Sequence, residues 1–115
     1  MNASSYTVRA AACALAFGAM FASQLAHAVD EDAAQALAKK SNCTKCHSVD
    51  KKKDGPSYKE TAAKYKGKPD AEQKLFTHLT TSPKVKVDGK EEEHASPKTK
   101  DEAEIKNLVA YILSR

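Results

Sequence analysis

Two cysteines and a histidine, close together near the middle of the chain, constrain its fold more than any other feature. Cys43, Cys46 and His47 form the pattern C-x-x-C-H. Thiols at this spacing lie on one turn of helix, so each can add to one of two vinyl groups on the same porphyrin edge. The histidine that follows then lies over the macrocycle, where a ring nitrogen can bind the iron. The pattern predicts one covalent haem c, anchored by Cys43 and Cys46, with its iron bound by His47.

Other interpretations compete for the same residues. Cys43 and Cys46 could form a disulfide, or a redox pair as in thioredoxin-like folds, but that fold requires a βαβ pattern and this chain has a helical one. The cysteines could also bind zinc together with His78 and His94. Those histidines are much further apart in sequence than the histidine pair of a zinc finger. The thiols could finally be incidental. Haem attachment is the interpretation that the rest of the chain favours.

The N-terminal segment is typical of a secretory signal. Arg9 precedes an apolar, alanine-rich stretch, and the segment ends in Ala26, His27 and Ala28, which fits the A-x-A rule for signal peptidase. The apolar stretch is shorter than the roughly 20 residues that span a membrane. We therefore expect residues 1–28 to be a cleaved signal peptide and residues 29–115 to be one periplasmic domain, not inserted in the membrane after cleavage.

The expected domain is small for a chain that must bury a core. Its large apolar side chains are few, and an exported domain of this size usually contains disulfides or another covalent or metal staple. After removal of Cys13 with the signal segment, only Cys43 and Cys46 remain. The net charge of the sequence is +4, and acidic residues are interleaved with the basic ones. This excludes a strongly basic nucleic-acid-binding surface, and we expect a monomer.

The apolar pattern predicts an all-α fold of short helices. Helices are expected at 30–40 and 58–65, in a segment that begins at Asp70, and in a last segment that begins at Asp101. Gln73 and Glu104 lie three residues after these two aspartates, as in a capping box. Residues 80–100 show no helical period and no convincing strands, although Asp88 and Gly89 are typical of a tight turn.

With these elements, residues 30–115 resemble the class I (monohaem) cytochrome c family. The resemblance rests on the first helix, C-x-x-C-H, Gly55 and Pro56 after a loop, the short middle helices and the terminal helix. It implies a cytochrome c fold that carries single electrons between redox partner proteins and is not an enzyme. It also implies that the Pro56 carbonyl accepts a hydrogen bond from His47, and that Tyr111 wedges where the terminal helices cross.

The sequence departs from the family pattern at the distal iron ligand. The usual methionine is missing, because the only methionines are Met1 and Met20. His94, followed by Pro97, occupies the position where the family has its methionine, so we expect His94 to bind the iron and the reduction potential to be low for the family. The alternatives are His78, which we expect on the solvated surface, a lysine such as Lys98, or an open site. An open site would make the protein a binder or sensor of small ligands, or a small haem peroxidase.

Exposed lysines are expected around the attachment motif, at Lys39, Lys40, Lys45 and 51–53. They could steer an acidic redox partner to the haem edge. The acidic run 91–93 could oppose them if it lies at the same edge.

Overall fold

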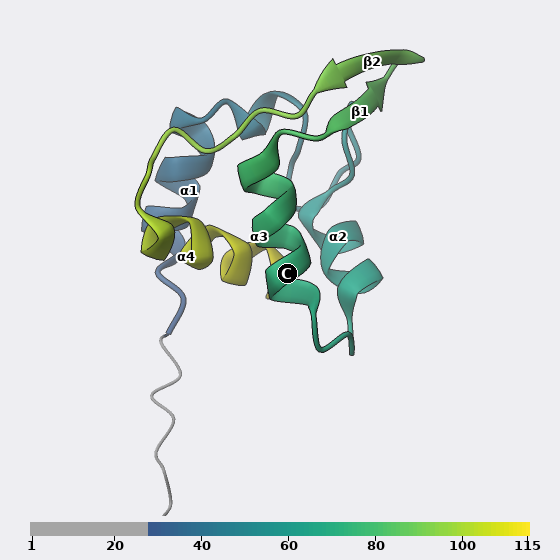
Figure 1. Ribbon diagram of the computed structural model, residues 1–115. Helices are drawn as coiled ribbons and strands as arrows, with labels where there is room; N and C mark the ends of the chain where they lie inside the picture. The colour runs from purple at the N-terminus through teal and green to yellow at the C-terminus, as the bar shows by residue number, and fades with distance from the viewer. Residues whose placement is uncertain (1–27) are drawn as a thin grey trace, which may run out of the picture.

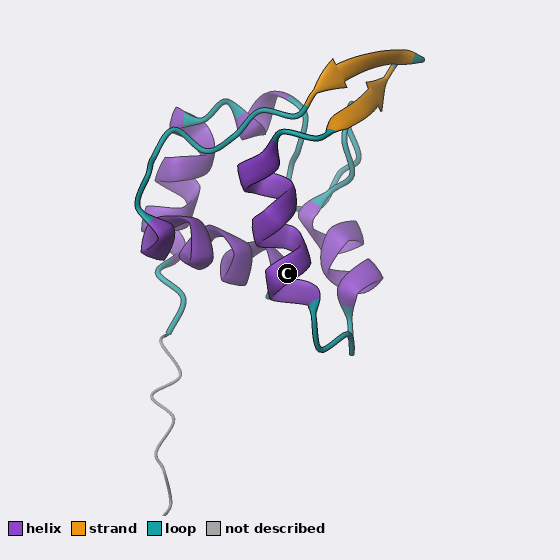
Figure 2. Ribbon diagram, in the orientation of Figure 1, coloured by secondary structure: helices purple, strands orange, loops and turns teal. Residues whose placement is uncertain are grey.

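The computed structural model describes residues 28–115, so the predicted signal segment, apart from Ala28, lies outside the described residues (Figure 1). Four α-helices, one short 3-10 helix and one two-stranded hairpin make up the described chain (Figure 2). In chain order they are α1 (Glu31–Lys40), η1 (Cys43–Lys45), α2 (Tyr58–Tyr65), α3 (Ala71–Thr81), β1 (Lys84–Val87), β2 (Lys90–Glu93) and α4 (Glu102–Leu113). The predominance of helix confirms the predicted fold class.

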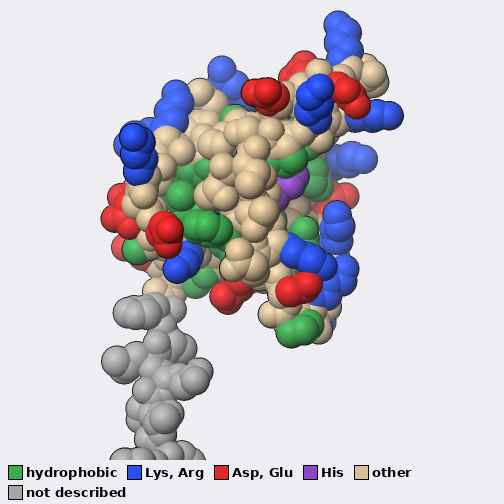
Figure 3. Space-filling model, viewed as in Figure 1, with side chains coloured by type: hydrophobic (Ala, Val, Ile, Leu, Met, Phe, Trp, Pro, Cys, Tyr) green, Lys and Arg blue, Asp and Glu red, His purple; other side chains and the backbone are tan. Residues whose placement is uncertain are grey.

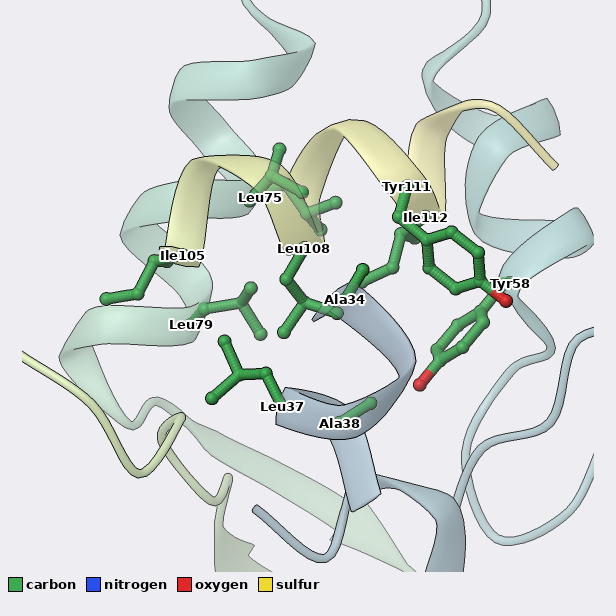
Figure 4. Close-up of a cluster of buried hydrophobic side chains, with 11 residues drawn as sticks. Ala34, Leu37, Ala38, Tyr58, Leu75, Leu79, Ile105, Leu108, Tyr111 and Ile112 are labelled. Carbon is green, nitrogen blue, oxygen red and sulfur yellow. The ribbon is translucent and has the colours of Figure 1, made fainter. Parts of the chain in front are cut away.

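The core lies where α1, α3 and α4 meet. Side chains from these three helices point toward one another, with Leu37, Leu79 and Leu108 at the centre (Figure 4). Leu108 is only 1% exposed. The full cluster is Ala34, Leu37, Ala38, Tyr58, Leu75, Leu79, Ile105, Leu108, Val109, Tyr111 and Ile112. Each fully buried Leu, Ile or Val stabilises the fold by about 1.5–3 kcal/mol, and the α4 stripe among them is the one that the sequence predicts.

The two ends of the described chain are joined by polar contacts. Asn107 on α4 accepts a hydrogen bond from the Asp30 backbone N–H (2.9 Å) and donates one to the Asp30 carbonyl (2.8 Å). Arg115 forms an ion pair with Glu31 at 2.6 Å. Tyr111 is buried in the core beside α1, together with the small residues Ala34 and Ala38. These contacts hold α1 against α4.

Helix capping differs from the prediction in two places. The Asp70 side chain makes no capping hydrogen bond and instead pairs with Lys74 one turn later, at 2.8 Å. Asp101 caps α4 through the Ala103 N–H (2.8 Å), but its own N–H bonds Thr99 and not Glu104. The predicted boxes are therefore wrong at Asp70 and only half formed at Asp101. A complete capping box begins α2 instead, between Ser57 and Glu60.

The hairpin β1–β2 was not predicted. Its register pairs Lys84 with Glu93 and Lys86 with Glu91, and the Asp88–Gly89 turn has positive φ at both residues, +48° and +78°. Such a turn matches the twist of the flanking strands. β1 alternates lysine and valine over only four residues, and β2 is charged and exposed throughout, so only one short strand carries the alternation that marks a half-buried strand. The hairpin projects from the helical body, and Lys, Asp and Glu side chains crowd it (Figures 1 and 3).

Candidate functional site

The turn η1 brings the two thiols and His47 together. Asn42 follows the end of α1 and adopts the left-handed conformation at φ +60°. Cys43–Lys45 then form a single 3-10 turn. The Cys43 carbonyl accepts hydrogen bonds from the N–H groups of Cys46 (3.2 Å) and His47 (2.9 Å). Both thiols are free and half-buried. Burial raises the pKa of the Cys43 thiol above its ordinary value.

The imidazole of His47 is fixed from one side. Its Nδ1 lies 2.7 Å from the Pro56 carbonyl oxygen, which can only accept, so Nδ1–H donates. This confirms the contact that the family resemblance implies. In the neutral ring this hydrogen bond fixes the tautomer, so that Nε2 is the nitrogen that can bind a metal. The Tyr58 ring stacks on the imidazole with centroids 6.0 Å apart.

Gly55 owes its identity to the His47 ring. A Cβ placed on Gly55 would overlap the imidazole, with Nδ1 only 2.8 Å away. The Gly55 N–H also donates to the Cys46 carbonyl at 2.9 Å. The backbone of this loop therefore passes against the imidazole at a distance that only glycine permits.

Replacement of Gly55 by alanine should displace His47. We expect a loss of about 1–3 kcal/mol in stability, as for other overpacked sites, together with a changed visible spectrum of the haem. Gly89→Ala is the control: no atom lies within 4 Å of the new Cβ, but the positive φ makes a side chain costly there, so it should lower stability without altering the spectrum. Chemical denaturation and absorption spectra of both variants test this. A Gly55→Ala protein with an unaltered spectrum would contradict the role given to the close approach.

The His94 ring lies close to the His47 ring and is tilted against it by 49°. His94 follows β2 directly, and its ring centroid lies 5.9 Å from that of His47. Its Nδ1 is buried and has no hydrogen-bond partner. A buried imidazole nitrogen without a partner is costly, and such an atom is available to bind a metal. Burial, followed by the charges of His78 and His47, lowers the pKa of His94 and keeps the ring neutral.

His78 belongs to this site and not to the solvated surface, so the prediction for His78 is wrong. Its ring lies edge-on to His94 with centroids 4.6 Å apart. The pKa of His78 is lowered, and burial is the largest cause. The spacing of apolar residues along α3 already indicated a partly buried position for His78. His78 comes three residues after Leu75 and one before Leu79, and so lies on the buried stripe of α3. Histidine side-chain atoms are visible beneath the hairpin in Figure 3.

These side chains fit a c-type haem better than the other interpretations. Both cysteines are free, which does not match a disulfide. Within residues 28–115 no group of three or more His, Cys, Asp or Glu side chains could hold a metal ion alone, which does not match zinc. Two thiols on one turn with an oriented imidazole after them are what attachment of a haem c requires, and a second imidazole lies close to the first. Bound there, a haem would supply one-electron chemistry at its iron.

Comparisons with known proteins support a c-type haem protein. The model of the cytochrome c family matches residues 31–115. Cytochrome c-551 of Stutzerimonas stutzeri is 39% identical over 100 residues, which cover 87% of this chain and 90% of that protein. Cytochrome c-551 of Allochromatium vinosum is 49% identical over 43 residues, and this match spans 37% of the chain and only 46% of that relative.

Two solved structures are similar over most of their length. The class 1 cytochrome MtoD from Sideroxydans lithotrophicus ES-1 is 57% identical with a TM-score of 0.73, over 76% of this chain and 97% of that one. Cytochrome c552 of Nitrosomonas europaea is 32% identical with a TM-score of 0.54, over 70% of this chain and 96% of that one.

Proposed function

The chain belongs to the cytochrome c family, and on that premise we propose that it is an exported carrier of single electrons and not an enzyme. Cys43 and Cys46 would attach its one covalent haem, and His47 and His94 would bind the iron. The protein's own part is to hold these four side chains, to exclude water and to set the potential. The electron itself resides on the haem iron.

One observation supports His94 as the second iron ligand: the ring centroids of His47 and His94 lie 5.9 Å apart. Imidazole nitrogens bind metals at about 2 Å, and each nitrogen lies roughly 1 Å from its ring centre. Two imidazoles on opposite sides of one iron are therefore about 6 Å apart between centres. The unpartnered Nδ1 of His94 and the absence of methionine after Met20 support the same assignment.

Two imidazoles give the iron different electronic properties from the usual ligand pair. A thioether ligand raises the potential of cytochromes c, and an imidazole in its place does not. By accepting the Nδ1–H hydrogen bond, the Pro56 carbonyl raises the basicity of His47 as an iron ligand. We therefore propose a potential below that of family members with methionine.

The experiment that tests this function is an absorption spectrum of the ferrous protein with and without carbon monoxide. A carrier with both axial positions occupied is low-spin and indifferent to the gas. A protein whose spectrum changes at once on addition of carbon monoxide would instead bind small ligands, which is the alternative function for this family fold.

Export to the periplasm is part of the proposal. Two observations support it. The N-terminal segment has the order of residues of a secretory signal, and the chain matches the cytochrome c family, whose haem is covalent. No helix within residues 28–115 is long and apolar enough to cross a membrane.

The charge distribution supports docking of an acidic redox partner, as proteins of this family act with partner proteins. Lys39, Lys40, Lys45 and residues 51–53 are exposed around the attachment turn. Glu91 and Glu93 lie on the hairpin, directly opposite Lys86 and Lys84. Since lysines face two of the three acids in register, the acidic run does not cancel the positive charge at the attachment turn.

Electron transfer with charged reagents should reveal this positive edge. We expect the rate with anionic ferricyanide to fall several-fold as ionic strength rises, because the Debye length shortens to about 10 Å at 0.1 M salt. Replacement of residues 51–53 by glutamine should flatten this dependence. The control replaces Glu102 and Glu104, at the start of α4, by glutamine. Stopped-flow rates that stay flat or rise with salt in the unaltered protein would refute the docking edge.

A further inference from the structure

The segment that carries His94 is tied to the ends of two helices. His94 N–H donates to the Pro83 carbonyl (2.9 Å), and the Ser96 hydroxyl shares a hydrogen bond with the Ser82 hydroxyl (2.6 Å). Both contacts connect the segment to the end of α3. A third contact runs to α1, where the Ser41 hydroxyl accepts a hydrogen bond from the Lys98 N–H at 2.8 Å. We call residues 94–98 the distal loop.

Ser41 is an unusual position for a hydroxyl. Its side chain is only 2% exposed, and it ranks among the most fully buried side chains of the described chain. Buried hydroxyls are costly unless they are hydrogen-bonded, and the bond recorded for the Ser41 side chain is the one from Lys98. The Ser41 backbone meanwhile caps α1 through Leu37. Ser41 thus belongs to a rigid helix end, two residues before the haem-anchoring Cys43.

We propose that Ser41 is a positioning residue that clamps the distal loop, with the Ser82–Ser96 pair as a second clamp. This inference rests on the proposed function, because it concerns the placement of His94. The distal loop has no regular secondary structure, and in it only Pro97 is buried. Without the clamp, His94 can leave its place more readily. Ser41 lies two residues before Cys43 and accepts a hydrogen bond from Lys98 in the distal loop. Its hydroxyl therefore links the attachment turn to the loop that carries His94.

The test is Ser41→Ala in the holoprotein. We expect the ferric protein to bind external imidazole, and the ferrous protein carbon monoxide, about tenfold more tightly than the unaltered protein, because the loss of one buried hydrogen bond corresponds to roughly tenfold in an equilibrium constant. Ser96→Ala removes the second clamp from an independent position and should give a change in the same direction. It also decides the outcome if Ser41→Ala fails to accumulate.

Asn107→Ala is the matched control. It removes two hydrogen bonds between α4 and Asp30, at the opposite end of α1, so it destabilises the protein without releasing the distal loop. Equal ligand binding by all three variants would reduce Ser41 to an ordinary stabilising residue and overturn the inference. An unaltered protein that resists both ligands, with clamp variants that resist them equally, overturns the inference alone. An unaltered protein that binds carbon monoxide freely overturns the proposed function and the clamp with it.

Discussion

Replacement of Cys43 and Cys46 together by alanine should yield a chain that does not fold. The buried cluster is small: it contains few large apolar side chains, and Ala34 and Ala38 are among its members. A domain of this size buries only a modest core, and a covalent staple adds stability that such a core lacks. The described chain has no disulfide, since both of its cysteines are free. Covalent haem is the remaining staple, and the double variant cannot acquire it.

Circular dichroism of the purified double variant measures this effect. We expect little helix, no cooperative melting and degradation when the chain is exported. The matched control replaces Thr44 and Lys45, the two exposed residues between the cysteines, by alanine, and should keep both haem and fold. If the double variant retains native helix content and melts cooperatively without haem, the haem is not what holds this fold together.

The sequence predicted the parts of the fold that depend on local chemistry. The stripe Ile105, Leu108, Val109 and Ile112 has a spacing that only a helix packed on a core uses, and α4 forms as expected. C-x-x-C-H likewise predicts one turn of helix, and η1 is that turn. In both cases the neighbours that matter lie within a few positions along the chain.

The parts that were missed depend on contacts between distant segments. β1 alternates lysine and valine over only four residues, and the charges of β2 find their partners only across the turn, so the hairpin has too little pattern along the chain to be predicted. The predicted surface position of His78 overlooks its apolar neighbour Leu79 and the contact with His94, which follows the hairpin and lies edge-on to the His78 ring. The capping prediction at Asp70 failed for a local reason, because Lys74 competes for the same carboxylate.

Sequence and geometry contribute differently to the candidate site. The pattern C-x-x-C-H identifies Cys43, Cys46 and His47 without any structure. His94 follows from the missing methionine and from its place before the last helix. Ser41 could not be found in this way, because a serine at the end of a helix is ordinary until its hydroxyl is seen buried against Lys98, 57 positions away.

His94→Ala should open the distal side of the haem. The unaltered protein is expected to be six-coordinate and low-spin. Without the second imidazole, the iron becomes high-spin, and carbon monoxide binds at least about a hundredfold more tightly, which corresponds to about 2.8 kcal/mol. The reduction potential is expected to shift as well, since the axial ligand is a main determinant of the potential.

His78→Ala is the control that gives this experiment its force. His78 lies 4.6 Å from His94 between ring centroids and is similarly buried, so its removal creates a comparable void next to the same site. We expect His78→Ala to stay low-spin and to resist carbon monoxide, because the ring that faces His47 at 5.9 Å is that of His94. If His94→Ala stays low-spin while His78→Ala opens the site, the distal ligand is His78. If neither variant changes the spectrum, the iron has no histidine on its distal side, and the small-ligand binder becomes the better description of the protein.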